Sequence, residues 1–273
     1  MSMDRVLKIT LSYDGTAYVG WQRQAGGVSI QGLLEDAIAR LEGSPVSVHG
    51  AGRTDAGVHA FGQVASARVS TRHDVAVIRR ALNGMLPPDV RVLGVEEAAP
   101  DFHARYSASG KTYEYRIWQG DVQPPFARAW SWQIPRDLDV EAMDGAARAL
   151  EGRHDFAAFQ SSGSGVVTST RTVTSARVHS APASPSLMIE PADRPAAEPG
   201  GRLVVLRIEA DGFLRHMVRA VAGTLVEIGD GRREPGSMAV LLAGRDRAAA
   251  GATAPAHGLV LVRVAYAARP STP

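Results

Sequence analysis

Residues 5–15 read RVLKITLSYDG, and residues 29–43 read SIQGLLEDAIARLEG. In the first stretch apolar side chains alternate with polar ones, which is typical of a half-buried strand that ends in an Asp-Gly turn. In the second stretch apolar side chains recur every three or four residues, which predicts a helix capped by Ser29 and ended by Gly43. The fold therefore begins with a strand followed by a helix.

The rest of the first hundred residues continues this alternation. Strands are expected at 46–51, 61–69 and 90–95, and a second helix is expected between its cap at Asp74 and a pair of prolines. The resulting order is strand, helix, strand, strand, helix, strand. This order is the split unit of ferredoxin-like folds.

The remaining residues repeat the pattern without obvious sequence identity. Helices are expected from Asp139 to a stop at Gly152, over 213–228 and over 238–242, and strands are expected at 111–119, 171–179, 202–209 and 259–266. A Pro-rich stretch at about 180–201 predicts a surface loop without chemistry. We therefore expect an α+β protein of two ferredoxin-like halves, 1–105 and 106–273. The halves would form a mixed, mainly antiparallel sheet with helices on one face and a central cleft.

The composition narrows the function classes. The 273 residues contain no cysteine, which excludes disulfides, thiolate metal sites and cysteine nucleophiles. No run approaches the roughly 20 apolar residues of a membrane helix, and the polar first residues continue into a strand rather than a signal peptide. We expect a cytoplasmic protein that makes no membrane contact.

The charge balance conceals a skew toward arginine. Thirty basic and 28 acidic residues give a formal net charge of +2, and 28 of the basic residues are arginines because Lys8 and Lys111 are the only lysines. Arginine suits bidentate contacts with phosphate and stacking on bases, although a GC-rich genome would produce the same bias. The small net charge favours a shaped basic cleft over nonspecific coating of a polyanion.

The densest cluster of unusual residues is HGAGRTDAGVHAFGQV, residues 49–64. Its glycines match neither common nucleotide motif, because Asp55 stands where the dinucleotide fingerprint needs glycine and no Gly-Lys-Ser/Thr is present. The stretch instead predicts a glycine-rich loop that presents Arg53, Thr54, Asp55 and His59 between two strands. Asp55 is then either a reactive carboxylate at the base of a cleft or a turn residue that pairs with Arg53.

Histidines in the first half raise the question of a metal site. His49, His59, His73 and His103 accompany Asp55 in this region, but their spacings match no helical ligand pair such as His-Glu-x-x-His. We therefore expect no metal site.

Two further segments bear on the role of Asp55. Residues 101–116 interleave basic and aromatic side chains, which suits either stacking on bases or a simple β core. Residues 212–219 predict an apolar helix that contains two arginines and a histidine. Because a buried arginine needs a carboxylate partner, Arg219 either pairs with Asp55 or extends its side chain to solvent.

These motifs resemble, in the same order, those of the tRNA pseudouridine synthase A family. The resemblance rests on GRTDAGVH at 52–59, YDGT at 13–16, GWQ at 20–22, FHARYS at 102–107, KTYEY at 111–115, FLRHMVR at 213–219 and Gly223-Thr224. It spans most of the chain but not the Pro-rich stretch. It implies an isomerase that converts uridine to pseudouridine in the anticodon stem-loop of tRNA, without cofactor or metal, and that acts as a homodimer.

The resemblance also implies roles for individual residues. Asp55 would be the catalytic aspartate, Tyr113 the ring that packs on the target uracil, and Arg219 the partner that keeps the carboxylate ionised. The other residues that would contact tRNA in the central RNA-binding cleft are Arg53, Arg72 or His73, Phe102, His103, Ala104, Arg105, Tyr106, Gly163, Ser164, Gly165, Val166 and Val167. A noncatalytic RNA-binding module is the competing function, and it has no need of Asp55 in a loop that faces phosphates. A metal-dependent hydrolase that uses the histidines is a third.

Overall fold

The computed structural model describes residues 4–161, 168–181 and 201–267. Over these ranges the chain forms ten β-strands and five α-helices, and the strand pairing is mixed and mainly antiparallel. The predicted α+β class is therefore confirmed. Most of the Pro-rich stretch lies outside the described residues. No helix in the described ranges is long and apolar enough to cross a membrane.

Contacts within the chain group it into two units. The first unit contains the residues up to Lys111 together with those from Val260 onward, and the second unit spans Thr112–Leu259. The halves predicted from the sequence instead met near residue 105 and placed the strand at 259–266 in the second half. Local sequence patterns cannot reveal this assignment, because it depends on a pairing between strands far apart in the chain.

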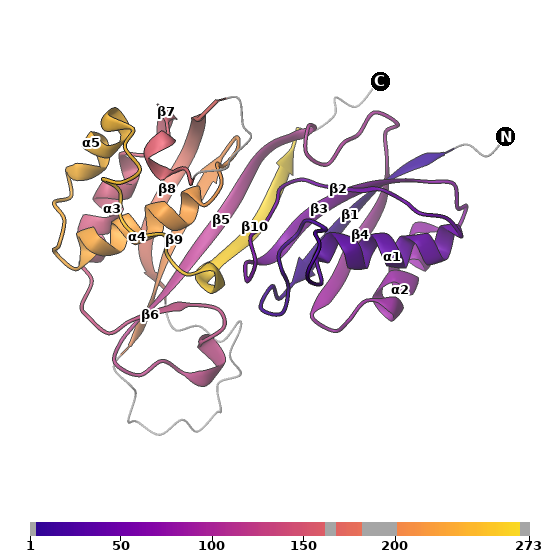
Figure 1. The fold of residues 1–273 in the computed structure, drawn as a ribbon, viewed down its shortest axis with the longest axis horizontal. Coiled ribbons are helices and arrows are strands. Elements are labelled where there is room, and N and C mark those ends of the chain that lie inside the picture. The colour runs from indigo at the N-terminus through magenta and orange to yellow at the C-terminus, as the bar shows by residue number, and fades with distance from the viewer. Residues whose placement is uncertain (1–3, 162–167, 182–200, 268–273) are drawn as a thin grey trace. The chain divides into compact units, whose positions relative to one another are not determined.

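The first unit has the ferredoxin-like order of elements that the sequence predicts. Its strands β1 (Arg5–Tyr13), β2 (Val48–Gly50), β3 (His59–Val69) and β4 (Val90–Ala98) are arranged β4-β1-β3-β2, and each neighbouring pair is antiparallel. Strand β10 (Leu259–Tyr266) runs parallel to β3. The edge of β3 opposite β1 is thus shared by β2 at one end and β10 at the other (Figure 1).

Helices α1 (Ile30–Glu42) and α2 (Val75–Met85) contact each other and pack on β2 and β4, respectively. The predicted caps are in place. Ser29 and Asp74 each accept a backbone N–H of the first turn, and Gly43 ends α1 in the left-handed conformation with a φ of 71°. The helix faces that contact the sheet bury Ile30, Leu34, Ile38, Ile78 and Leu82.

The second unit repeats part of this arrangement. Its strands are β5 (Ala108–Gln119), which begins in the first unit, β6 (Trp132–Ile134), β7 (Gly152–Asp155), β8 (Thr170–Ala181) and β9 (Arg202–Ala210). They are arranged β5-β9-β8-β7, with β6 parallel to β5. The order β5-β9-β8 corresponds to β1-β3-β2 of the first unit.

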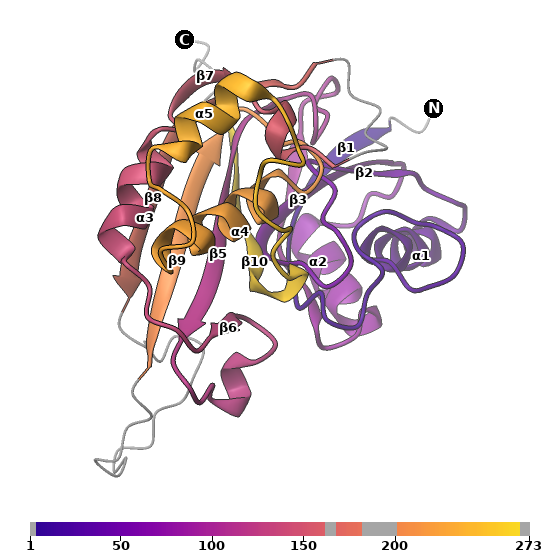
Figure 2. The same ribbon diagram turned by 60° about the vertical axis from the view of Figure 1, so that its left-hand side comes forward.

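Three helices of the second unit gather on one side of its sheet (Figure 2). They are α3 (Val140–Arg148), α4 (Met217–Gly229) and α5 (Ser237–Gly244), and α3 contacts β8 and both other helices. Asp139 caps α3 as predicted, by accepting the N–H of Ala142. Helix α4 is buried on most of its surface, which explains its almost continuous apolar sequence.

Two predicted helix boundaries are wrong. The helix expected over 213–228 begins at Met217, because His216 adopts a left-handed φ of 61° and cannot continue a right-handed helix. The helix expected to stop at Gly152 ends at Arg148, and Gly152 instead starts β7 with a φ of 105°. The short strands β6 and β7 lack the long alternation that identifies a strand in a sequence.

Candidate active site

The loop that carries Asp55 connects β2 to β3 in the first unit. Arg53 is exposed and Asp55 is half-buried, whereas Thr54 between them is only 6% exposed. The N–H of Val58 donates to the carbonyl of Asp55 at 3.1 Å, so Asp55 opens a tight turn. The loop thus keeps Thr54 inside the protein while its two charged neighbours reach the surface.

A buried polar network holds this loop from beneath. The hydroxyl groups of Tyr13 and Thr54 are 2.8 Å apart, and the side-chain amide of Gln63 donates to the carbonyl of Gly52 at 2.9 Å. The same amide lies 3.4 Å from the Tyr13 hydroxyl. Burial raises the pKa of Tyr13 to about 12, so the hydroxyl stays protonated at neutral pH. Tyr13 and Gln63 therefore anchor the residues on both sides of Arg53.

The motifs at 13–16 and 20–22 pack against the Asp55 loop. The N–H of Trp21 donates to the carbonyl of Thr54 at 3.0 Å. A Cβ at Gly15 would lie 2.0 Å from the Val58 carbonyl oxygen, and one at Gly20, where φ is 105°, would lie 2.6 Å from that of Thr54. Because only glycine permits these approaches, the two motifs let the backbone at Gly15 and Gly20 pack directly against the Asp55 loop.

His59 contacts the motif at 13–16. Its ring is fully buried, and Nδ1 lies 3.0 Å from the N–H of Gly15 and 3.1 Å from a carboxylate oxygen of Asp14. An unprotonated Nδ1 accepts the N–H of Gly15, so the ring ties the start of β3 to the turn after β1. Across the described part of the chain, no group of three or more His, Asp or Glu side chains is placed to hold a metal ion.

Tyr113 lies on β5 in the second unit and is 7% exposed. Its ring meets the ring of Phe213 edge to face, with centroids 5.0 Å apart and an interplanar angle of 82°. This geometry is favourable for aromatic pairs and fixes the plane of the Tyr113 ring. Phe213 lies in irregular backbone before α4 and not in the predicted helix, and its ring orients Tyr113.

Arg219 lies in the first turn of α4. Its Nε donates to the carbonyl of Ala254 at 2.8 Å, and the Ala254 N–H donates to the carbonyl of Arg219 at 3.1 Å. Burial, and after it the charge of Arg219, lower the pKa of His257. Because Nε bonds to a carbonyl of its own chain, a bidentate contact with a carboxylate would use the two Nη atoms.

The Gly223-Thr224 pair explains how the Ala254 segment is held. A Cβ at Gly223 would lie 1.8 Å from the carbonyl oxygen of Ala252, so the segment packs directly on the backbone of α4. The hydroxyl of Thr224 accepts the N–H of Gly251 at 3.0 Å. Both residues therefore act on Arg219 indirectly, through the segment that binds its guanidinium.

The conformation of His216 and its contact with Ser161 could not be predicted from the sequence. His216 is the residue before α4, and its Nδ1 lies 2.8 Å from the hydroxyl of Ser161, whose N–H donates to the carbonyl of Arg215 at 3.2 Å. Histidine is one of the few residues enriched at positive φ, which is the only available signal. Ser161 directly precedes the undescribed residues 162–167, so the predicted RNA-binding positions 163–167 lie outside the described residues.

The other predicted RNA-binding residues of the first unit lie in two places. Arg72 and His73 are exposed between β3 and α2. Phe102, His103, Ala104, Arg105 and Tyr106 form a turn that precedes β5, in which Arg105 and Tyr106 are exposed and Ala104 is fully buried. The structure thus brings Arg53 and Asp55 together in one loop and residues 102–106 together in one turn.

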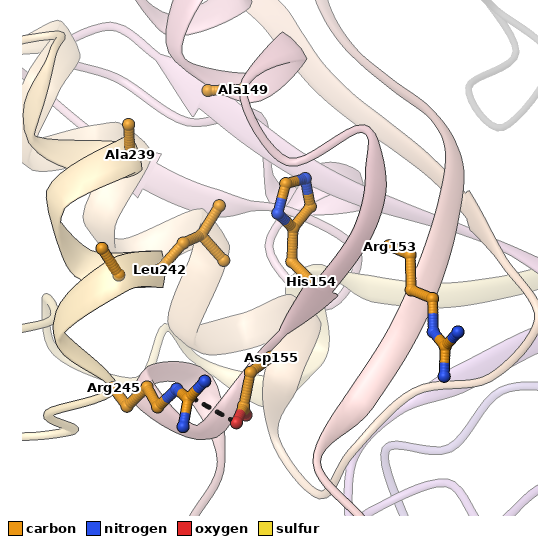
Figure 3. Close-up of a pocket in the computed structure, with 8 residues that line it drawn as sticks. Ala149, Arg153, His154, Asp155, Ala239, Leu242 and Arg245 are labelled. Atoms are coloured by element: carbon orange, nitrogen blue, oxygen red, sulfur yellow. Dashed lines mark ion pairs between the residues drawn. The ribbon is translucent and has the colours of Figure 1, made fainter.

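A surface pocket of about 350 Å³ in the second unit contains none of the predicted site residues (Figure 3). Nε of Arg245 pairs with Asp155 at 3.2 Å, and the hydroxyl of Ser169 donates to the same carboxylate at 2.5 Å. The pocket is lined by Ala149, Arg153, His154, Asp155, Ala239, Leu242, Ala243 and Arg245. Within it, Asp155 links Ser169 to Arg245, the residue that follows α5.

Comparison with known proteins identifies a consistent set of relatives. A family model described as tRNA pseudouridine synthase matches residues 9–107 and 146–267. The chain is 43% identical over 262 residues to tRNA pseudouridine synthase A of Syntrophotalea carbinolica, with 96% of each chain covered. It is 45% identical to that of Nitratidesulfovibrio vulgaris, covering 95% of this chain and 99% of the relative, and 46% identical to that of Moorella thermoacetica with the same coverages.

Proposed function

Because the chain belongs to the tRNA pseudouridine synthase family, we propose that it isomerises uridine to pseudouridine in the anticodon stem-loop of tRNA. The observation that carries the proposal is the setting of Asp55. This carboxylate is half-buried in a loop that a buried network and two glycine motifs hold in place. Such a frame suits a carboxylate that must meet a reacting atom in one orientation.

The reaction sets three demands on the site. The bond from C1′ to N1 breaks, the uracil turns, and C5 joins C1′, while C5 loses a proton and N1 gains one. This requires a carboxylate nucleophile, a pocket that grips the released base, and a group that removes the C5 proton. We assign the first role to Asp55, because it is the acidic residue of the loop held in place.

Arg219 and Tyr113 are the proposed partners of Asp55. The guanidinium of Arg219 is fixed through Nε, and its charge would keep the carboxylate ionised at neutral pH. Tyr113 is buried and oriented by Phe213, which suits a ring that packs on the uracil and whose hydroxyl assists removal of the C5 proton. Extracting the uridine from its stack costs a few kcal/mol, which phosphate contacts would offset.

Those phosphate contacts are assigned to exposed basic residues. Arg53 and Arg105 are exposed, as are Arg72 and His73, and each is carried by a segment that folded strands position. Residues 163–167 complete the proposed RNA-binding set. We also propose that the protein acts as a homodimer. Size-exclusion chromatography with light scattering tests this proposal: a mass of twice the chain supports the dimer, and the mass of one chain contradicts it.

The catalytic proposal is tested with Asp55→Asn and unmodified tRNA. Pseudouridine is mapped by chemical labelling, and tRNA binding is measured in parallel. We expect no product from Asp55→Asn and retained binding, whereas Asp36→Asn, which removes a surface carboxylate paired with Arg23, leaves both unchanged. Full activity of Asp55→Asn would remove Asp55 from the mechanism. Binding by the unaltered protein without any product would favour the noncatalytic RNA-binding module.

A further inference from the structure

Three rings of the first unit are stacked in a row that ends in solvent. His49 on β2 and His103 have centroids 4.8 Å apart and an interplanar angle of 25°, and His103 and Tyr106 have centroids 4.4 Å apart and an angle of 34°. We call these three residues the ring stack. Tyr106 at its outer end is 78% exposed. The family resemblance places His103 and Tyr106 at the RNA, whereas His49 has no RNA contact assigned to it.

The turn that carries His103 and Tyr106 is held in place by hydrogen bonds to β3 and β10. Ala104 is fully buried, its N–H donates to the Ser66 hydroxyl at 3.0 Å, and its carbonyl accepts from the Tyr266 hydroxyl at 2.8 Å. The N–H of Ser107 donates to the carbonyl of His103 at 2.9 Å. The exposed ring of Tyr106 therefore sits on a fixed base and loses little conformational entropy when a ligand binds.

The surroundings of the ring stack are polar and favour a nucleic acid. The guanidinium of Arg105 lies 5.8 Å from the centroid of the Tyr106 ring. The imidazole of His103 accepts the N–H of Arg105 at 3.1 Å, and burial, followed by the charges of His49 and Arg105, lowers the pKa of His103. His103 is therefore neutral at neutral pH where it lies between the rings of His49 and Tyr106, and the neighbouring Arg105 is a cation that can reach a phosphate.

The cavity beside the ring stack has room for a nucleotide. Its volume is about 430 Å³, and its lining includes His49, Ser66, Arg68 and His103 together with the carboxylates of Asp4 and Glu42. Pockets of this size bind small organic groups. The imidazole rings, hydroxyl and guanidinium suit an uncharged base, whereas the two carboxylates disfavour a phosphate inside the cavity. An extended RNA strand could thus place one base on Tyr106 and its neighbour toward this cavity.

We propose that the ring stack binds an unpaired nucleobase of the RNA other than the reacting uridine, by stacking on Tyr106. The inference rests on the proposed function for the identity of the ligand as RNA. Stacking of a base on an aromatic ring tolerates any sequence, because every base has a π face, and contributes about 1–3 kcal/mol per base. The ring stack therefore adds affinity for the RNA and takes no part in the chemical step.

The first test compares Tyr106 variants in binding and in turnover. With unmodified tRNA, we expect Tyr106→Ala and Tyr106→Leu to raise both Kd and KM about 5- to 150-fold, the range that 1–3 kcal/mol corresponds to, with kcat unchanged. Tyr106→Phe, which keeps the ring, should stay within twofold of the unaltered protein. The matched control is Phe126→Ala, which removes an aromatic side chain that is 79% exposed in the second unit.

The second test separates stacking from phosphate contact. The slope of log Kd against log salt concentration should fall by about one for Arg105→Gln and stay unchanged for Tyr106→Ala. The inference would be overturned if the Kd of Tyr106→Ala or of Tyr106→Leu for tRNA lay within twofold of that of the unaltered protein. Loss of product in Asp55→Asn tests the function separately, so either claim can fail alone.

Discussion

The hydroxyl of Tyr13 on β1 lies 2.8 Å from the hydroxyl of Thr54, the residue directly before Asp55. The two residues are 41 positions apart, and both are buried. A buried hydroxyl pair is stable only while each group keeps a partner. The placement of Asp55 is therefore coupled to the interior of the first unit and not only to its own loop.

Tyr13→Phe should lower kcat several-fold and leave KM for tRNA nearly unchanged. The substitution keeps the ring but leaves the Thr54 hydroxyl without this partner, which costs about 1–3 kcal/mol of unfolding free energy. Steady-state kinetics and urea denaturation measure the two effects. Thr54→Ser and Thr54→Val form the matched pair, because serine keeps the hydroxyl and valine replaces it with a methyl group. Equal activity of these two variants would show that the hydrogen bond does not position Asp55.

Two helical glycines should respond to alanine in opposite ways. A Cβ at Gly223 in α4 would collide with the Ala252 carbonyl oxygen, whereas a Cβ at Gly145 in α3 meets nothing within 4 Å. Gly145→Ala should therefore raise the unfolding free energy by up to about 1 kcal/mol. Gly223→Ala should lower it by about 1–3 kcal/mol and reduce kcat, because the segment that binds Arg219 moves. Thermal unfolding and kinetics of both variants provide the measurement.

Substitutions at His216 should separate backbone strain from side-chain bonding. His216→Ala keeps the positive φ and loses the bond to Ser161, and should cost about 1–2 kcal/mol. His216→Gly relieves the strain while losing the bond, so its loss should be smaller. His216→Asn should be close to the unaltered protein, because asparagine tolerates this conformation and its amide occupies the position of Nδ1. The inverse ranking in urea denaturation would contradict the hydrogen bond's role.

Acid should weaken the link between Asp155 and Ser169. The hydrogen bond from Ser169, then one from the N–H of Ala157 and the charge of Arg245, hold the pKa of Asp155 below its usual value. The folded state therefore gains stability above the unfolded pKa of about 3.9 and loses that gain as the pH falls further. The deficit of Asp155→Asn in unfolding free energy should be constant from pH 5 to 7 and shrink below about pH 4. A deficit that persists unchanged at pH 3 would refute this assignment, and exposed Asp121→Asn serves as control.

Features set by local chemistry were predictable from the sequence. Ser29, Asp74 and Asp139 cap their helices as predicted, because an N-cap is decided by one side chain and the backbone that follows it. Strands β1 and β10 were also predictable, because their alternation of apolar and polar side chains is a local pattern. The predicted start of α4 failed because a left-handed residue interrupts a pattern that is otherwise apolar at helical spacing.

Features set by distant contacts were not predictable. The polar network of Tyr13, Thr54 and Gln63 joins three segments that are separate in the sequence, and a buried tyrosine or glutamine looks like any other strand residue. The Asp55 loop itself could be found because its glycines and charges are unusual together. The roles of the neighbouring glycine motifs became visible only once Gly15 and Gly20 were placed against that loop.

Strand β10 also has a consequence for biosynthesis. It pairs with β3 at His59 and Ala60, immediately after the Asp55 loop, although about 200 residues separate the two strands. A ribosome that adds about 5–20 residues per second needs roughly 10–40 seconds to make that intervening stretch. During this interval β3 of the nascent chain lacks its β10 partner directly after the Asp55 loop. An abortive translation product that ends before Leu259 would lack β10 and with it the strand that pairs with β3 directly after the Asp55 loop.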